Sequence, residues 1–292
     1  MTESSDYSIE AKNLTCRYGR CVALDRLNFA IEGPTVLGLV GKNGSGKSTL
    51  LRLLCGWEKP TDGMITIAGS VPYDTRKVLK DILFLDEKVE FDFTLTLAGI
   101  LDKCAFMDER FDLLYAHDVA AQFSLNLKKR YAQLSKGMKN QFGIIVALAF
   151  NRPITVMDEP VSGLDEGARK LFYSLLVKSQ IHNPRIFVVS THLLGEFEQY
   201  ADTFMVLRDG RIAAYDKRET FETLFIQVSG QSEYVERAIE GLEICKIKEF
   251  AGMRNVTVPN LMDHERKRFA EQHNVDIRHV SVNEACVILG GL

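Results

Sequence analysis

The sequence predicts an α/β fold in which short buried strands alternate with helices. Residues 35–40 form an apolar, β-branched run that is typical of a buried parallel strand. Residues 48–55 carry the apolar spacing of a helix, and Gly56 supplies a stop signal directly after it. Two further short apolar runs, at residues 154–157 and 186–189, each follow a helical stretch. Strands that alternate with helices in this way indicate a parallel sheet covered by helices.

The remaining segments predict a main domain of residues 1–220 and a small α+β domain of residues 221–292. The length of 292 residues suits one large core with an appendage. Residues 88–150 show mainly helical spacing, with Leu113, Leu114 and Val119 on one face, and predict an inserted helical subdomain. In the small domain we expect strands at 223–228, 255–258 and 277–282, and charged helices at 232–240 and 264–272.

Charge and hydropathy exclude several classes of function. The chain has 36 Lys and Arg residues against 39 Asp and Glu, a formal net charge of -3, so it lacks the basic excess of a nucleic-acid-binding protein. No apolar run approaches the roughly 20 residues that cross a bilayer. The polar, acidic start does not resemble a secretory signal. We therefore expect a cytoplasmic protein with no membrane span and no nucleic-acid partner.

A glycine-rich segment lies between the first predicted strand and the helix that follows it. Residues 41–48 read Gly-Lys-Asn-Gly-Ser-Gly-Lys-Ser, which matches the GxxxxGK[ST] phosphate-binding loop in its required context. Such a loop points consecutive N–H groups and a helix N-terminus at phosphate oxygens. Lys47 would neutralise the β- and γ-phosphates, and Ser48 would ligate Mg²⁺. A turn without a ligand is the alternative. The predicted phosphate-binding residues are Gly41, Asn43, Gly44, Ser45, Gly46, Lys47, Ser48 and Thr49.

Two carboxylates follow the predicted strand at residues 154–157. A phosphate-binding loop needs an acidic partner at the end of another buried strand, and Asp158 and Glu159 lie there. Asp158 would hold Mg²⁺, through water, while Glu159 would polarise the attacking water as general base. Acidic residues that merely end a strand are the alternative interpretation.

Three further motifs complete a series in which the sequence resembles the ATP-binding cassette (ABC) ATPases. Residues 134–139 read Leu-Ser-Lys-Gly-Met-Lys and resemble the family's LSGGQ signature. Residues 162–165, Ser-Gly-Leu-Asp, resemble its D-loop, and residues 190–192, Ser-Thr-His, resemble its switch histidine. The resemblance covers residues 8–220. It implies a P-loop NTPase fold with a mixed-sheet core and a helical subdomain.

The resemblance also implies roles for residues of these motifs. Ser135 and Gly137 would reach the γ-phosphate of ATP held by another subunit, and Asp165 would join the nucleotide site from the D-loop. His192 would contact the γ-phosphate and align Glu159 with water. Tyr18 lies where the family has an aromatic residue that stacks on adenine.

One position departs from the family pattern. The family's Q-loop glutamine, expected after the strand at residues 82–85, is absent from the segment Phe-Leu-Asp-Glu at 84–87. Glu87 is the best positional match and Asp86 the rival. A carboxylate there can still ligate Mg²⁺, but it adds negative charge beside the phosphates.

The resemblance implies an ATP-hydrolysing subunit that sandwiches two ATP molecules in a homodimer or heterodimer and powers a separately encoded membrane permease. The LSKGMK spelling and the C-terminal appendage are similar to single-cassette ATPases of drug, bacitracin and antimicrobial-peptide exporters. The chain would be peripheral on the inner face of the cell membrane, with its permease near residues 88–134. The alternatives are a soluble ABC ATPase that acts on ribosomes or nucleic acid, and a low-turnover regulatory nucleotide-binding module.

Overall fold

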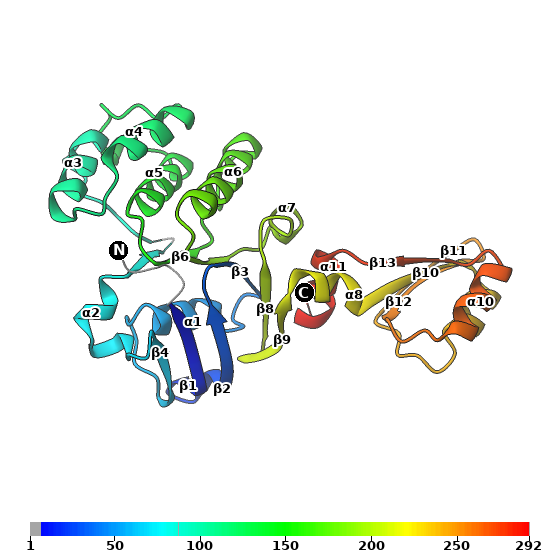
Figure 1. The fold of residues 1–292 in the computed structure, drawn as a ribbon. Helices are drawn as coiled ribbons and strands as arrows, with labels where there is room; N and C mark the ends of the chain where they lie inside the picture. The colour runs from blue at the N-terminus through cyan, green and yellow to red at the C-terminus, as the bar shows by residue number, and fades with distance from the viewer. Residues whose placement is uncertain (1–6, 87, 292) are drawn as a thin grey trace. The chain divides into compact units, whose positions relative to one another are not determined.

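The structure, a computed structural model, describes residues 7–86 and 88–291 (Figure 1). The chain divides after Tyr215 into two compact units, Met1–Tyr215 and Asp216–Leu292. The predicted domain boundary between residues 220 and 221 falls inside helix α8 (Arg218–Leu224). In the described part of the chain, no helix combines the length and the apolar character that a membrane span needs.

The core of the first unit is a six-stranded sheet with the order β5-β6-β7-β3-β8-β9. Its first five strands run parallel to their neighbours, which confirms the α/β class. Strands β3 and β7 are buried along their whole length, as their largely apolar sequences predict. The strands are β3 (Thr35–Val40), β5 (Ile82–Leu85), β6 (Ile154–Asp158), β7 (Ile186–Ser190), β8 (Thr203–Arg208) and β9 (Arg211–Lys217).

A second, antiparallel sheet completes the mixed core. It has the order β2-β1-β4, with β1 (Ser8–Tyr18), β2 (Cys21–Glu32) and β4 (Asp62–Ile67). Its apolar side chains share one hydrophobic cluster with helix α1 (Lys47–Leu54). The register of β1 and β2 shifts at several points, and Asn13 and Arg26 have φ near +50°. These irregularities interrupt the alternation of polar and apolar residues, which explains why the sequence did not predict these strands.

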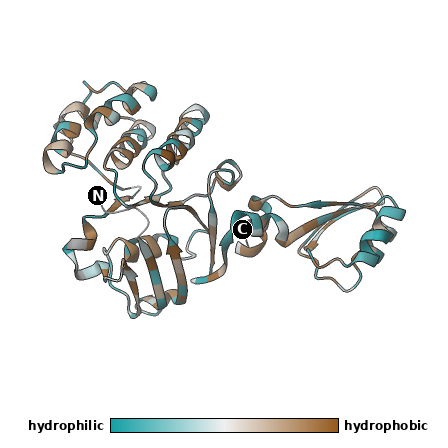
Figure 2. Ribbon diagram, in the orientation of Figure 1, coloured by the Kyte–Doolittle hydropathy of each residue, from teal (hydrophilic) through white to brown (hydrophobic). Residues whose placement is uncertain are grey.

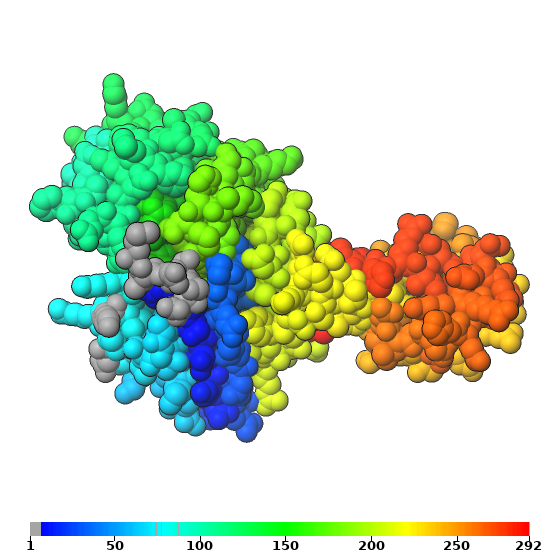
Figure 3. Space-filling view, viewed as in Figure 1, coloured from blue at the N-terminus to red at the C-terminus, as the bar shows by residue number. Residues whose placement is uncertain are grey.

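Helices α3 (Leu97–Met107), α4 (Leu113–Gln122), α5 (Lys136–Ala149) and α6 (Glu166–His182) gather on one side of the parallel sheet, green in Figures 1 and 3. Helix α5 is buried from Phe142 onward and begins earlier than its apolar run. The predicted common face of α4 is wrong for Leu114, which is 84% exposed. Ala116, Val119 and Ala120 form its buried face instead. The short helices of this unit are η2 (Pro72–Asp74), α2 (Arg76–Leu79), η3 (Tyr131–Gln133) and α7 (Leu194–Phe197).

The second unit has the order β-α-β-β-α-β between helices α8 and α11 (Val282–Gly290). Its antiparallel sheet has the order β11-β12-β10-β13, which is the ferredoxin-like arrangement. Apolar residues of the strands and of helices α9 and α10 form its core, while α10 is largely hydrophilic (Figure 2). The elements are β10 (Phe225–Gln231), α9 (Ser232–Ala238), β11 (Lys246–Phe250), β12 (Met253–Pro259), α10 (His264–Gln272) and β13 (Asp276–His279).

Two predicted strands of this unit have the wrong bounds. The strand expected at 223–228 begins only at Phe225, because the two residues before it end helix α8. The strand expected at 277–282 ends at His279. Ser281 then caps α11, because its side chain accepts a hydrogen bond from the backbone N–H of Glu284. The apolar residues after the strand therefore belong to a helix.

Candidate active site

The loop between β3 and α1 needs glycine at three positions. Gly41, Gly44 and Gly46 have φ values of 156°, 83° and 104°. A Cβ atom on Gly46 would lie 2.6 Å from the carbonyl oxygen of Ala23, and one on Gly41 would lie 2.4 Å from that of Leu207. No atom of the described residues lies within 4 Å of a Cβ on Gly44. The loop is therefore packed tightly at both ends, while its middle faces open space.

The start of α1 is prepared for an anion. Gly46 is the N-cap, and no side-chain cap and no acidic residue lies in the first turn, so the helix dipole is uncompensated. Lys47 Nζ donates to the carbonyl oxygens of Gly41, at 2.5 Å, and Lys42, at 3.1 Å. The hydroxyl of Ser45 is buried without a hydrogen-bond partner among the described residues. The uncapped start of α1 and the unpaired Ser45 hydroxyl fit the oxygens of a phosphate chain.

Burial lowers the pKa of the Lys47 ammonium, while the nearby carboxylates of Glu159 and Asp158 act in the opposite direction. An ammonium that burial destabilises gains most when a negatively charged ligand reaches it. The electrostatics of Lys47 therefore favour a phosphate close to its Nζ atom.

The carboxylates at the end of β6 are oriented by the neighbouring strand. Asp158 pairs in register with Ser190 of β7. The Ser190 hydroxyl donates to the carboxylate of Asp158, and its oxygen accepts the backbone N–H of Glu159 at 2.9 Å. Sequence reasoning assigned Ser190 no role, although it begins the segment that contains the switch histidine.

Glu159 and His192 are in direct contact. His192 Nδ1 lies 2.7 Å from Glu159 Oε2, and the backbone N–H of His192 donates to the same oxygen at 3.3 Å. Glu159 has φ +50° and precedes Pro160, a conformation that is unfavourable for a residue before proline. Strained backbone of this kind is concentrated at functional sites. The structure thus brings together the predicted base and the predicted switch residue.

The start of α5 carries the signature residues. Ser135 is its N-cap, and its hydroxyl oxygen accepts the backbone N–H of Met138 at 3.3 Å. A Cβ atom on Gly137 would lie 2.7 Å from the carbonyl oxygen of Gly163. The side-chain amide of Asn140 donates to the carbonyl oxygen of Ser162. The signature helix therefore packs directly on the D-loop of the same chain.

Asp165 has a structural partner within the chain. Its carboxylate caps α6 by accepting the backbone N–H of Ala168 at 2.8 Å. This bond fixes the end of the D-loop. A contact between Asp165 and nucleotide stays a prediction.

Tyr18 lies beside the first turn of α1 and is 47% exposed. Its hydroxyl donates to the carboxylate of Glu58. Burial and this hydrogen bond raise the pKa of Tyr18 to about 12, while the Thr49 side chain acts in the opposite direction. The interaction with Thr49 places Tyr18 next to the phosphate-binding loop. Stacking of Tyr18 on adenine stays a prediction.

Glu87, the predicted replacement for the Q-loop glutamine, lies outside the described residues. Its rival Asp86 lines a cavity of about 450 Å³ together with Asp158 and Glu159. Lys136 and Lys139 of the signature segment line the same cavity, and sequence reasoning gave them no role. Lys139 Nζ lies over the Tyr131 ring, 4.9 Å from its centroid.

The fold and the site together define a P-loop nucleotide-binding protein. The ABC transporter family matches residues 24–162 of the chain. The uncharacterised ABC transporter ATP-binding protein YcbN of Bacillus subtilis (strain 168) is 32% identical over 241 residues, which cover 79% of this chain and 74% of that protein. The bacitracin transport ATP-binding protein BcrA of Bacillus licheniformis is 31% identical over 248 residues, which cover 78% and 77%.

Solved structures agree with these relatives. An ATP-binding subunit of an ABC transporter has a TM-score of 0.67 and 27% identity, and the match covers 73% of this chain and 91% of that chain. A dimeric ATP-binding cassette in a post-hydrolysis state, bound to ADP and Pi, has a TM-score of 0.63 and 25% identity, with coverage of 72% and 98%. The chain belongs to the ABC transporter family and is an ATP-binding cassette.

Proposed function

We propose that this chain hydrolyses ATP, dimerises around it and powers a separately encoded membrane permease, which exports drugs, peptides or other amphiphiles. The observation that carries the ATPase proposal is the contact of 2.7 Å between Glu159 and His192, on the strand ends next to the uncapped start of α1. The exporter proposal is supported by the likeness to a bacitracin transport ATP-binding protein. The chain would then lie at the inner face of the cell membrane, with the permease near residues 88–134.

The oxygen donors beside the phosphate loop suit Mg²⁺. Asp158 accepts a hydrogen bond from Ser190 through Oδ1, and its Oδ2 has no hydrogen-bond partner among the described residues. This oxygen and the hydroxyl of Ser48 are hard ligands of the kind that Mg²⁺ prefers. When bound, Mg²⁺ would neutralise charge on the β- and γ-phosphates. Glu87 stays a further candidate ligand.

The residues of the site have separate tasks in hydrolysis. The backbone of the loop and Lys47 bind the phosphates and hold the γ-phosphorus in place. Glu159 accepts the proton of a water molecule as its oxygen attacks the γ-phosphorus, and the bond from that phosphorus to the bridging oxygen breaks to give ADP and phosphate. His192, which contacts Glu159 Oε2, holds this carboxylate in the required direction.

The second contact to the γ-phosphate would come from another subunit. Ser135 uses its oxygen to accept the N–H of Met138, so its O–H remains able to donate to a phosphate. The N-terminus of α5 adds a favourable dipole. Two copies, or this chain and a paralogue, would each supply this surface to the ATP held by the other.

The substitution Glu159→Gln tests the ATPase proposal. The variant should bind ATP and accumulate as a closed dimer, but release phosphate at least about 100-fold more slowly, because the general base is lost. Phosphate release and size-exclusion chromatography with ATP measure both effects. Glu166→Gln is the matched control, since Glu166 is exposed on α6, where it pairs with Lys170 and interacts with Arg169. Normal turnover in Glu159→Gln would remove Glu159 from the base role.

Co-purification tests the partner. The tagged chain, recovered from its native cell in mild detergent, should carry a multi-span membrane protein in near-equal amount. Recovery with ribosomes or nucleic acid instead would contradict the exporter proposal and support a soluble ATPase.

A further inference from the structure

A turn that is distant in sequence supports the phosphate-binding loop from behind. Residues 208–211 form the β8–β9 turn. The backbone N–H of Gly210 donates to the carbonyl oxygen of Ser45 at 3.2 Å, and the carbonyl oxygen of Gly210 accepts the N–H of Asp25 at 2.8 Å. A Cβ atom on Gly210 would lie 2.8 Å from the carbonyl oxygen of Ala23. The turn is therefore wedged between strand β2 and the loop that holds the phosphates.

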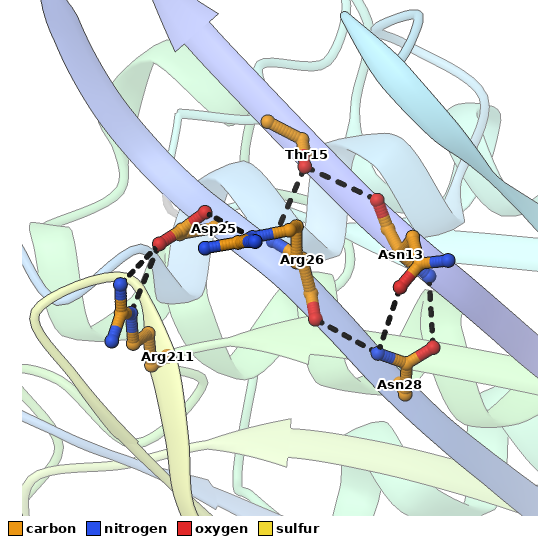
Figure 4. A network of polar contacts seen from close by, with 6 residues as sticks. All are labelled: Asn13, Thr15, Asp25, Arg26, Asn28 and Arg211. Carbon is orange, nitrogen blue, oxygen red and sulfur yellow. Dashed lines mark hydrogen bonds and ion pairs between the residues drawn. The ribbon is translucent and has the colours of Figure 1, made fainter.

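One ion pair fastens this turn to β2. Arg211 donates to Asp25 Oδ2 through Nε, at 3.0 Å, and through Nη2, at 2.6 Å (Figure 4). The hydrogen bond from Arg211 is the main cause that lowers the pKa of the Asp25 carboxyl. Arg26 occupies the other carboxylate oxygen at 3.2 Å. Both oxygens of Asp25 thus have cationic partners, and Arg211 is the partner that comes from a distant segment of the chain.

Strand β2 is irregular around Asp25, and side-chain hydrogen bonds hold its backbone there. Arg26 has φ +51°, and its backbone N–H donates to the Thr15 hydroxyl at 3.2 Å. The Asn28 amide bridges Asn13 and the carbonyl oxygen of Arg26, as the dashed lines in Figure 4 show. Such an irregularity changes the direction in which the neighbouring side chains of the strand point, and Asp25 is one of them.

We propose that Arg211 is a positioning residue for nucleotide binding. Through its pair with Asp25 it holds the β8–β9 turn, and through Gly210 this turn holds the backbone at Ser45 in the conformation that receives phosphate. Arg211 itself does not touch the nucleotide. The inference rests on the proposed function, since it assumes that residues 41–48 bind ATP. ATP and ADP share the phosphates that lie next to this backbone. The affinity for each nucleotide therefore depends on the Arg211–Asp25 ion pair.

The test compares two arginines of the same turn. Arg211→Gln should raise the dissociation constants of ATP and ADP alike by about two- to fivefold, the range for an exposed ion pair, and leave kcat within about twofold. Arg211→Lys should raise the dissociation constants by an intermediate factor, because lysine keeps the positive charge but lacks the paired Nε and Nη2 donors. Arg208→Gln is the control, because the Arg208 guanidinium pairs at 3.8 Å with its neighbour Asp209, within the turn itself. This variant should bind both nucleotides like the natural chain. Calorimetry and steady-state phosphate release on the full chain give these values.

A double-substitution cycle separates positioning from general destabilisation. Asp25→Asn should match Arg211→Gln, and the variant with both changes should bind no more weakly than the weaker single one, since both remove one interaction. Unchanged nucleotide affinity in well-folded Arg211→Gln overturns the inference. So does a loss of kcat without a change in affinity, because fewer folded molecules produce that result. If the natural chain binds no ATP, the proposed function itself fails, and this outcome is distinct from the others.

Discussion

Two helix starts in this chain are proposed to hold ATP phosphates, and they are built differently. Helix α1 begins after Gly46 with no side-chain cap, whereas α5 begins after Ser135, which caps it through the N–H of Met138. Among the described helices of eight or more residues, α1 alone lacks such a cap. The other caps are Thr96, Asp112, Asp165, Asp263 and Ser281.

The two helix starts differ in what satisfies the N–H groups of the first turn: a side chain at α5 and, under the proposed function, a bound phosphate at α1. A missing cap costs a helix about 1 kcal/mol, but it leaves N–H groups that a phosphate can use. Under the proposed function, the start of α1 would therefore be less stable by itself and would be completed by the ATP that binds to the same chain. At the start of α5 the Ser135 cap already satisfies the N–H of Met138, as expected under the proposed function for a preformed surface that would meet ATP held by another subunit.

The largest expected effect concerns α1. Lys47→Ala should weaken ATP binding by about 100-fold or more, because a partly buried ammonium no longer meets the phosphate charge. Equilibrium binding of a fluorescent ATP analogue measures this loss. Lys170→Ala, on the exposed surface of α6, should bind normally. Strong binding by the Lys47 variant would mean that the start of α1 is not the phosphate site.

The start of α5 should behave in the opposite way. Ser135→Arg should still bind ATP, yet lose about 20-fold or more in hydrolysis, because the bulky cation blocks the surface that another subunit's nucleotide needs. Light scattering with ATP should also show fewer dimers. Weakened ATP binding by the isolated variant would place Ser135 in its own chain's site and erase the contrast.

A mixture of these two variants tests the shared site directly. In a head-to-tail dimer of Lys47→Ala with Ser135→Arg, one site combines both defects and the other has neither. Random pairing should restore about a quarter of natural activity, since half the dimers hold one of two sites intact. Absence of recovery, with mixed dimers present, would count against the head-to-tail arrangement.

The parts of the site that local sequence controls were predictable. The strands at 35–40, 154–157 and 186–189 are apolar apart from Thr35 and Thr155, so hydrophobicity identifies them as buried strands, and the structure confirms them. Parallel strands end at one edge of the sheet, which is why Glu159 and His192 meet. The order of the motifs along the chain therefore predicted which of their residues lie close together in space, as well as the family to which the chain belongs.

Contacts that depend on irregular backbone were not predictable. Arg211 and Asp25 are 186 residues apart, and no periodic pattern links them. The φ near +50° at Asn13 and Arg26 breaks the strand pattern on which prediction depends. In the second unit the predicted strand at 277–282 is too long, because Ser281 caps helix α11 at a point where the apolar residues had indicated more strand.

A moderate effect is expected from the residue beside α1. Tyr18→Ala should weaken ATP binding by about tenfold, because a stacked base loses roughly 1 kcal/mol or more with its aromatic partner. Tyr18→Phe should stay within about twofold, since it keeps the ring and loses only the bond to Glu58. Competition between ATP and inorganic triphosphate adds a control, because triphosphate has no base and should bind both variants equally. If Phe and Ala behave alike, the ring does not stack on adenine.

The smallest effect tests whether the start of α5 is preformed by packing on the D-loop. Gly137→Ala places a Cβ 2.7 Å from the carbonyl oxygen of Gly163, so the helix start must shift and unfolding should become easier by about 1 kcal/mol. Gly167→Ala is the matched control on α6, where the nearest atom would lie 3.4 Å away. That change should be neutral or stabilising by about 0.5 kcal/mol, because alanine favours a helix. Denaturant unfolding of both variants decides the point: equal stabilities would show that Gly137 has room, and that its close approach to Gly163 does not fix the start of α5 against the D-loop.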